Sequence, residues 1–366
     1  MNTVLSISQS YGEQILAHYL LHGKVPSVNH QYKHRIQAAL FLQLDTPNKL
    51  YRVINRQFKT LQRLIQQPVY RVYHIPKKRG GQRLIEVPEP ELVQVQKSLN
   101  FFLQCYYTSL RPAPVHGFIR QQNKHFKSLS IISNAEAHIN KTAVLNIDLK
   151  DFFQNISSQQ IYQLFRSPLF NFNENMAAAY TLLCTYNGHL PTGAPSSPIL
   201  SNFICLSLDK ALEQFSLLNE LTYTRYADDL TFSSNQTIGT NTILDIINLI
   251  QENGFKVNDK KVRITGRRGR QLVTGLVVNQ RVNVDRRYIR ELRATIHHLK
   301  LNGLPAASTK HFKLDHTASD TQQQHFLKRL NAKIAFVGSV RGKFDPVYLK
   351  LKRGFAEGLG ENVRVR

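Results

Sequence analysis

Tryptophan is absent from the chain, and its 366 residues include only three cysteines and two methionines. Cys105, Cys184 and Cys205 are too few and too widely spaced for a disulfide framework or a zinc site. We therefore expect reduced thiols in a cytoplasmic protein. No run of about 18 apolar residues occurs, and the first residues lack the charged start and apolar stretch of a signal peptide. These absences argue against a membrane-bound or exported protein.

Acidic residues are also scarce, since 24 Asp and Glu stand against 48 Lys and Arg. The resulting formal charge of +24 and pI near 10.0 indicate a polyanionic partner, with nucleic acid as the leading candidate. An anionic membrane surface is the competing partner, but no basic amphipathic segment supports it. Without tryptophan, any stacking on bases would depend on the 15 Tyr and 20 Phe residues.

Two of the few acids, Asp228 and Asp229, are adjacent in residues 221–234, LTYTRYADDLTFSS. Strand-forming residues precede and follow them, so a β-hairpin with the acids at its tip is predicted. Aspartate is common in exposed turns, and that is the alternative interpretation. Neighbouring carboxylates with apolar flanks repel each other, and a divalent cation such as Mg²⁺ would relieve the repulsion.

A third acid, Asp148, ends the apolar run Val-Leu-Asn-Ile-Asp-Leu of residues 144–149. This run predicts a buried strand. Two strands that each carry acids out of an apolar interior could hold two metal ions between them. Two ions in that arrangement can activate a hydroxyl and stabilise the leaving oxygen in phosphoryl transfer.

The remaining pattern predicts an α+β fold. Residues 1–67 have helical spacing, and residues 69–87 predict a hairpin with a basic, glycine-containing tip. Further helices are expected at residues 92–107 and 243–251, and Arg-rich helical spacing continues over residues 286–300. Residues 301–319 are expected to form a polar connection to a last helix at 322–337.

Several ordered motifs resemble the reverse transcriptases. They are the hairpin of residues 69–87, HGF at 116–118, the strand that ends in Asp148, LPTGAPSSPILSN at 190–202 and YADD at 226–229. Asn134 and His138 form an NAxxH motif, and residues 273–275 read VTG, as in bacterial retron reverse transcriptases. Thr192 departs from the family, which has glutamine there to help position the nucleotide. Taken alone, Asn134 could simply cap a short helix.

The resemblance implies a right-hand polymerase and assigns its parts. The fingers would comprise an N-terminal helical region, 1–67, and the region of the basic hairpin, 68–140. The palm would span 141–284, with an insertion of the fingers expected within it, and the RNA-binding thumb would span 285–366. It also implies that Asp148, Asp228 and Asp229 are catalytic and bind two Mg²⁺ ions.

Residues expected at the incoming nucleotide are Lys77, Arg83, Asp151, Phe153 and Lys261, although Lys260 is an alternative to Lys261. Phe153 would exclude a 2′-hydroxyl, unless it is simply core. Twelve residues are expected at RNA: Asn134, His138, Arg267, Arg268, Arg270, Val273, Thr274, Gly275, Arg286, Arg287, Arg290 and Arg293.

The function implied is that of a retron RNA-directed DNA polymerase. It would use dNTPs to copy part of a cognate noncoding RNA into single-stranded DNA, giving a branched RNA–DNA product called msDNA. A separate effector protein and a role in anti-phage defence are implied as well. The alternatives are a reverse transcriptase of a group II intron or diversity-generating type, and a non-catalytic RNA-binding scaffold.

Overall fold

The computed structural model describes residues 33–54, 56–77, 80–120 and 128–360, together with residues 14, 17 and 18. The chain divides into two compact units. The first, here called the sheet unit, comprises Met1–Ser130 and Leu145–Ile264. The second, the C-terminal unit, comprises Ile131–Val144 and Thr265–Arg366. Within the described ranges, no helix is both long enough and apolar enough to cross a membrane.

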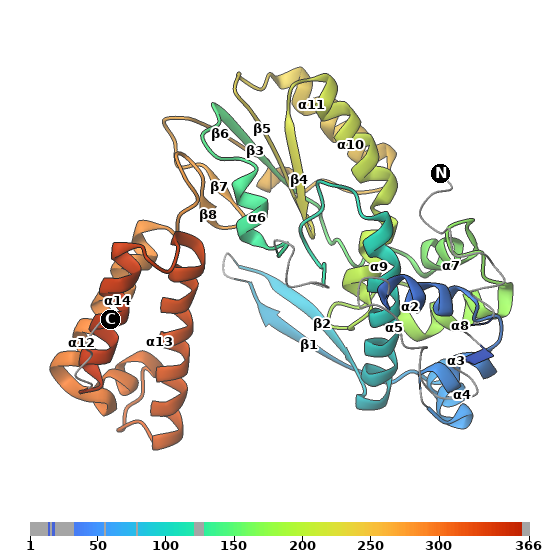
Figure 1. Ribbon diagram of the computed structural model, residues 1–366, viewed down its shortest axis with the longest axis horizontal. Coiled ribbons are helices and arrows are strands. Elements are labelled where there is room, and N and C mark those ends of the chain that lie inside the picture. Colours follow the sequence, from blue (N-terminus) through green and yellow to red (C-terminus); the bar gives the residue numbers. More distant parts are fainter. Residues whose placement is uncertain are drawn as a thin grey trace. The chain divides into compact units, whose positions relative to one another are not determined.

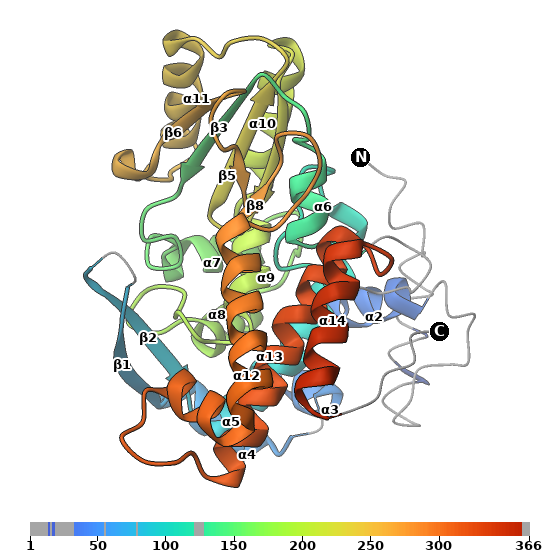
Figure 2. The same cartoon turned by 90° about the vertical axis from the view of Figure 1, so that its left-hand side faces the viewer.

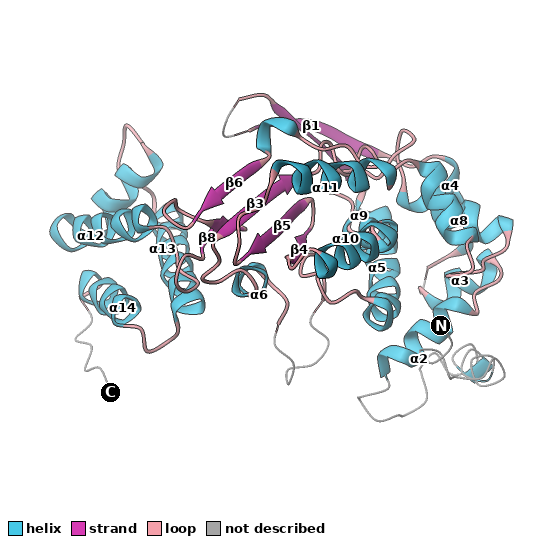
Figure 3. Ribbon diagram, turned by 90° about the horizontal axis from the view of Figure 1, so that it is seen from above, coloured by secondary structure: helices cyan, strands magenta, loops and turns pink. Residues whose placement is uncertain are grey.

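A four-stranded sheet holds the three acids. Its strands are β3 (Ala143–Asp148), β4 (Thr222–Tyr226), β5 (Asp229–Ser234) and β6 (Arg263–Gly266), in the order β4-β5-β3-β6 (Figure 3). β4 and β5 form the predicted antiparallel hairpin, and Tyr226 pairs with Asp229 at its tip. β3 is buried along nearly its whole length, as its apolar sequence predicts.

Helices pack against this sheet. α10 (Leu206–Leu218) packs on β4, and α11 (Thr240–Glu252) packs on α10 (Figure 1). α10 buries Leu208, Leu212 and Ser216 at helical spacing, which explains why it lies along the sheet. The short 3₁₀ helix η1 (Asp259–Lys261) follows α11.

The helical region of the sheet unit has an aromatic core. Its helices are α2 (Lys33–Leu42), α3 (Pro47–Val53), α4 (Phe58–Gln66), α5 (Pro90–Leu110), α7 (Ser158–Arg166), α8 (Glu174–Cys184) and α9 (Ser197–Ile204). Phe41, Phe165, Phe172 and Tyr180 contact one another through their rings and are buried, so phenylalanine and tyrosine supply the bulk that tryptophan would otherwise give. The part of the predicted N-terminal helical region before residue 33 lies almost entirely outside the described residues.

The predicted basic hairpin is present as β1 (Tyr70–Pro76) and β2 (Gln82–Pro88), which pair antiparallel (Figure 2). The 190–202 loop joins it, because the Glu86 backbone N–H donates to the Thr192 carbonyl at 2.8 Å. The buried Glu86 carboxylate also lies 2.9 Å from His189 Nε2. β2 is therefore fixed to the loop that precedes α9.

The C-terminal unit is mainly helical. It contains α6 (Ile131–Glu136), the short strands β7 (Leu272–Val273) and β8 (Leu276–Val277), and the helices α12 (Arg286–Phe312), α13 (Asp320–Arg341) and α14 (Pro346–Gly358). The three long helices share a core that includes Leu292, Ile296, Phe326, Ile334 and Leu351. The predicted helix at 322–337 is confirmed, with a capping box between Ser319 and Gln322 at its start.

The polar connection predicted at residues 301–319 is wrong in its first part. α12 continues to Phe312, with one break at Gly303, whose φ of 70° only glycine adopts readily. Pro305 then lies in the first turn of the resumed helix, where its missing N–H is tolerated. Ala307 and Ser308 are buried in this segment. Glycine and proline therefore mark a break within a helical segment here, not a loop.

Candidate active site

The three acids meet where β3 and the β4–β5 hairpin end side by side. β5, which starts at Asp229, neighbours β3, which ends at Asp148. The backbone N–H of Leu149 donates to the Asp228 carbonyl at 3.0 Å, so the main chain joins the two acid-bearing ends. The alternative of an isolated exposed turn at Asp228 and Asp229 does not describe this geometry.

Burial and neighbouring negative charge raise the pKa of two of the three acids. Burial, followed by the charge of Asp148, raises the pKa of Asp228. Burial, followed by the charges of Asp228 and Asp148, raises the pKa of Asp229 to about 6. Asp229 is nevertheless an exposed residue, so the repulsion from its two neighbours is the cause that the geometry supports most directly. The site thus concentrates negative charge that a cation would stabilise.

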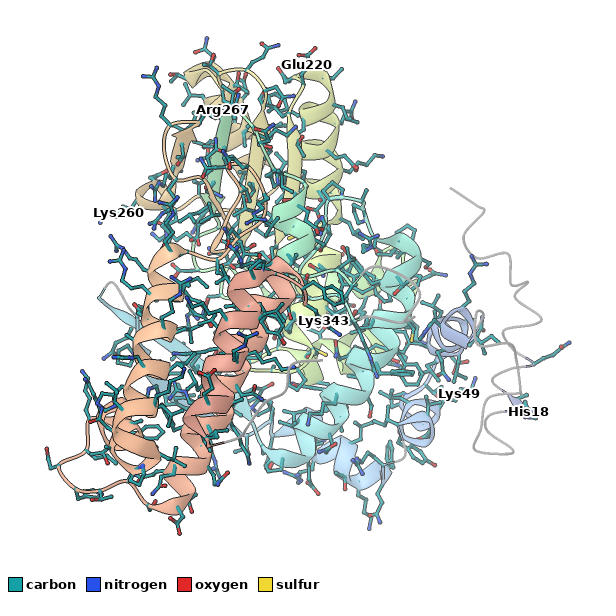
Figure 4. The ribbon with its side chains drawn as sticks, turned by 60° about the vertical axis from the view of Figure 1, so that its left-hand side comes forward. His18, Lys49, Glu220, Lys260, Arg267 and Lys343 are labelled. Atoms are coloured by element: carbon teal, nitrogen blue, oxygen red, sulfur yellow. The ribbon has the colours of Figure 1, made fainter. Side chains whose placement is uncertain are left out.

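Lys261 supplies one positive charge to these acids. Its Nζ lies 2.7 Å from Asp148 Oδ1, and Asn258 Nδ2 donates to Asp148 Oδ2 at 3.3 Å. The Lys261 charge also lowers the pKa of Asp228 and of Asp229, against the larger effects that raise them. Lys260 points away from the fold into solvent (Figure 4). Of the two lysines, Lys261 is therefore the one at the acids.

The carboxylates of the three acids suit a hard cation that keeps other ligands of its own. Among the described residues, no three His, Cys, Asp or Glu side chains are grouped closely enough to form a metal site by themselves. Mg²⁺ commonly takes one or two carboxylates and completes its shell with water and substrate phosphate. Hard carboxylate oxygens that repel one another fit that mode of binding.

The residues expected at the nucleotide differ in their exposure and in their neighbours. Arg83 is exposed on β2, and its charge lowers the pKa of Asp228, so it lies near the acids. Phe153 is half-buried and its ring centre lies 6.0 Å from that of Phe118, whereas Phe152 is buried as core. Asp151 is exposed with a φ of 45°, and Lys77 is exposed at the tip of the β1–β2 hairpin.

The HGF segment packs directly on the acidic turn. The Arg225 N–H donates to the Pro114 carbonyl and the His116 N–H donates to the Arg225 carbonyl, each at 2.9 Å. A Cβ added to Gly117 would lie 2.5 Å from the Ala227 backbone nitrogen. Glycine is required at this position because two backbones meet there.

Replacing Gly117 with alanine should therefore displace the turn that carries Asp228. Backbone atoms cannot rotate out of the way as a flexible side chain can, so the hairpin tip must shift. A displacement on the order of 1 Å can slow a reaction about a hundredfold. We expect that loss in the rate of primer extension, and Gly239→Ala, where an added Cβ meets nothing within 4 Å, is the matched control. Equal rates for both variants would contradict the packing role of Gly117.

The VTG motif forms the turn between β7 and β8. Thr274 and Gly275 both have positive φ, 47° and 83°, as a tight two-residue hairpin turn requires. Thr274 Oγ1 donates to the Ile131 carbonyl at 3.0 Å, which ties the turn to α6. Asn134 and Val273 are buried in this unit, as is His138. Asn134 lies inside α6 and does not cap it, and direct contact of these residues with RNA stays a prediction.

Seven arginines line a groove of about 850 Å³ in the C-terminal unit. They come from the loop after β6, from the segment between β8 and α12, and from the start of α12: Arg267, Arg268, Arg270, Arg281, Arg286, Arg287 and Arg290. Arg270 pairs with Asp285, the residue that caps α12. Arg293 lies one turn further along α12 and lines adjoining pockets. Arg281 was not among the residues expected at RNA, because it stands apart from the other arginines in the sequence, between Gln280 and Val282.

The fold is that of a right-hand polymerase. It has a sheet with acids at the ends of adjacent strands, a basic hairpin and a helical C-terminal unit. The family described as "Reverse transcriptase (RNA-dependent DNA polymerase)" matches residues 75–325, so the chain belongs to the reverse transcriptases. It is thus an RNA-directed DNA polymerase.

Within that family the chain belongs to the bacterial retron reverse transcriptases. It is 36% identical over 235 residues to the Retron Ec86 reverse transcriptase of Escherichia coli, covering 63% of this chain and 70% of the relative. It is 32% identical over 258 residues to the Retron Mx65 reverse transcriptase of Myxococcus xanthus, covering 64% of this chain and 58% of that relative. Among solved structures, the match to telomerase from Candida albicans covers 81% of this chain and 64% of the telomerase chain. The sequence identity is 12% and the TM-score is 0.43.

Proposed function

We propose that this reverse transcriptase copies part of a cognate noncoding RNA into msDNA, a branched RNA–DNA molecule, and serves in anti-phage defence with a separate effector protein. The observation that carries the proposal is the similarity to retron enzymes, 36% identity over 235 residues, together with the NAxxH and VTG motifs in the sequence. The resemblance to retron enzymes also implies that DNA synthesis is primed from the 2′-hydroxyl of a guanosine in that RNA. The proposed parts are fingers at 1–67 and 68–140, palm at 141–284 and thumb at 285–366.

Asp148, Asp228 and Asp229 would hold two Mg²⁺ ions through their carboxylates. When bound, such ions activate the primer hydroxyl and stabilise the leaving oxygen. Support comes from the convergence of the three acids and from the pKa of Asp229, which their repulsion helps to raise to about 6. A bound cation would relieve the repulsion between these carboxylates, so they are suited to binding a cation.

The basic residues around the acids would bind the triphosphate of the incoming dNTP. Arg83 and Lys261 lie within electrostatic reach of Asp228, and Lys77 would contribute from the hairpin tip. Lys261 would also give a proton to the leaving pyrophosphate. Phe153 and Asp151 lie in the loop that follows Asp148, where the Phe153 ring would exclude a 2′-hydroxyl.

The arginine groove would bind the phosphates of a stem in the noncoding RNA. Guanidinium groups suit phosphate oxygens, and an RNA helix is recognised mainly through its backbone. The ion pair between Arg270 and Asp285 and the hydrogen bond from Arg267 to Asn140 at 3.2 Å fix two of the seven side chains. The others are available to a polyanion.

Removing two groove arginines should weaken binding to RNAs of different sequence by about the same factor. For Arg268→Ala with Arg287→Ala, we expect the Kd for a structured RNA to rise about tenfold or more, with the salt dependence reduced by about two phosphate contacts. A filter-binding titration at several salt concentrations measures both. Lys328→Ala with Arg329→Ala on α13 removes the same charge outside the groove and should change Kd much less. Equal losses from the two pairs would contradict a localised site.

Sequencing the nucleic acid that copurifies with the protein tests the msDNA proposal. The expected result is RNA joined covalently to short single-stranded DNA. Linear DNA copies without a branch would instead favour a group II intron or diversity-generating type. RNA without any DNA, from cells in which the enzyme is expressed with its neighbouring genes, would favour an RNA-binding scaffold.

A further inference from the structure

Arg225, directly before the YADD motif, is among the largest fully buried side chains of the described residues, with 0% exposure. Burying a guanidinium is unfavourable unless its charge and its donors are satisfied. Arg225 Nε donates to Asp209 Oδ1 at 2.7 Å, and Nη2 donates to Asp209 Oδ2 at 2.6 Å. Asp209 lies on α10 and is also fully buried. One side of the guanidinium is therefore bound to a helix beside the sheet.

The remaining nitrogen of Arg225 reaches the acidic turn. Nη1 donates to the Ala227 carbonyl at 3.2 Å and to Asn202 Oδ1 at 3.0 Å. Asn202 in turn donates through Nδ2 to the Gly117 carbonyl at 3.1 Å. A single side chain thus links α10, the C-terminal half of α9 and the turn, and Asn202 extends the link to the HGF loop.

The turn needs such support because its backbone is strained. Ala227 has a φ of 60°, in the left-handed region that residues with a side chain avoid. Its carbonyl belongs to the peptide bond that leads into Asp228. Strain of this kind persists only where surrounding contacts hold it, and it is found at functional sites.

We propose that Arg225 is a positioning residue for DNA synthesis. Held by Asp209, its Nη1 fixes the Ala227 carbonyl and so sets where Asp228 and Asp229 place their carboxylates. The inference rests on the polymerase activity of the family and on the acids as metal ligands, not on msDNA synthesis. A buried ion pair adds little net stability compared with apolar residues of the same size, so orienting a neighbouring group is a sufficient reason for its presence.

Arg225→Lys tests this role. Lysine keeps the positive charge and can pair with Asp209, but its single nitrogen cannot also hold Ala227 and Asn202. In single-nucleotide incorporation on an RNA template, we expect kcat to fall about 30- to 100-fold, with KM for the dNTP within about threefold. The Mg²⁺ concentration that gives half-maximal rate should rise severalfold. A purely structural role would lower thermal stability and leave the rate per folded molecule and the Mg²⁺ dependence unchanged.

Arg341 provides a matched control, because its guanidinium has the same kind of arrangement. Its Nε and Nη2 donate to Asp345 at 2.8 Å and 3.0 Å, and its Nη1 donates to Asn283 Oδ1 at 2.6 Å. Arg341→Lys should lower stability and change kcat less than twofold. If Arg225→Lys does not fold, Asn202→Ala decides, since it removes one partner of Nη1 without removing a buried charge.

A loss of kcat in Arg225→Lys or Asn202→Ala, with Arg341→Lys near wild type, supports the proposal. Wild-type kcat and Mg²⁺ dependence in folded Arg225→Lys, or in Asn202→Ala when that variant decides, would overturn it. Failure of the wild-type enzyme to extend a primer would instead count against the polymerase assignment itself. The two failures are therefore distinguishable.

Discussion

Asp229→Asn is expected to slow primer extension at least about a thousandfold, equivalent to roughly 4 kcal/mol of transition-state stabilisation. Asparagine has the same shape but lacks the charge that would bind a divalent cation. A rapid-quench assay with an RNA template, a DNA primer and Mg²⁺ measures the loss. Asp245→Asn, at an exposed position of α11, is the matched control and should retain the wild-type rate.

The same substitution should not destabilise the metal-free protein. The folded-state pKa of Asp229 is about 6, above its ordinary value, so the native state holds the proton more tightly than the unfolded state. Stability without divalent ions therefore falls as pH rises from about 4 to about 6, and asparagine removes that fall. At pH 7 we expect a Tm equal to or about 2 °C above wild type, because exposure of the group weakens the effect. A large decrease in Tm would contradict the repulsion described here.

Asp209→Ala should give the largest loss of stability. It leaves the Arg225 guanidinium buried without its carboxylate and also removes the acceptor of the Tyr223 hydroxyl, which lies 2.9 Å from Asp209 Oδ1. Breaking a buried pair from one side costs about 3–5 kcal/mol. This corresponds to a decrease in Tm of about 10 °C for a unit of this size.

An exposed ion pair supplies the comparison for that loss. Asp45, which precedes α3, pairs with Lys49 of that helix at 2.8 Å, and the Asp45 side chain is 58% exposed. Asp45→Ala should cost less than about 1 kcal/mol. Urea unfolding followed by circular dichroism measures both variants. Similar losses for Asp209→Ala and Asp45→Ala would show that the buried pair contributes no more than a surface pair.

Local patterns predicted the parts of the fold whose signal is contained in a few consecutive residues. The acidic hairpin and the buried strand ending in Asp148 follow from alternation and apolar runs, and both are confirmed. The basic hairpin is confirmed for the same reason. The likeness to retron reverse transcriptases, which depends on ordered motifs, is confirmed by the comparisons.

Other features depend on tertiary contacts that the sequence does not display. Arg225 was passed over because an arginine before YADD gives no sign that Asp209, 16 residues earlier, will bury it. α14 was missed because its basic residues, including Lys350 and Arg353, obscure a narrow buried face at Leu351 and Gly354. The polar connection expected at residues 301–319 is helical up to Phe312, because the helix resumes after Gly303 once Ala307 and Ser308 can pack.

Asp148→Asn tests most directly whether Asp148 and the distant pair Asp228 and Asp229 act as one site for divalent ions. The measurement is single-turnover extension of a primer on an RNA template over a range of Mg²⁺ concentrations. We expect the wild-type enzyme to extend the primer only with the divalent ion and Asp148→Asn to be slower by at least about a thousandfold at every Mg²⁺ concentration. Extension by Asp148→Asn at the wild-type rate would contradict it.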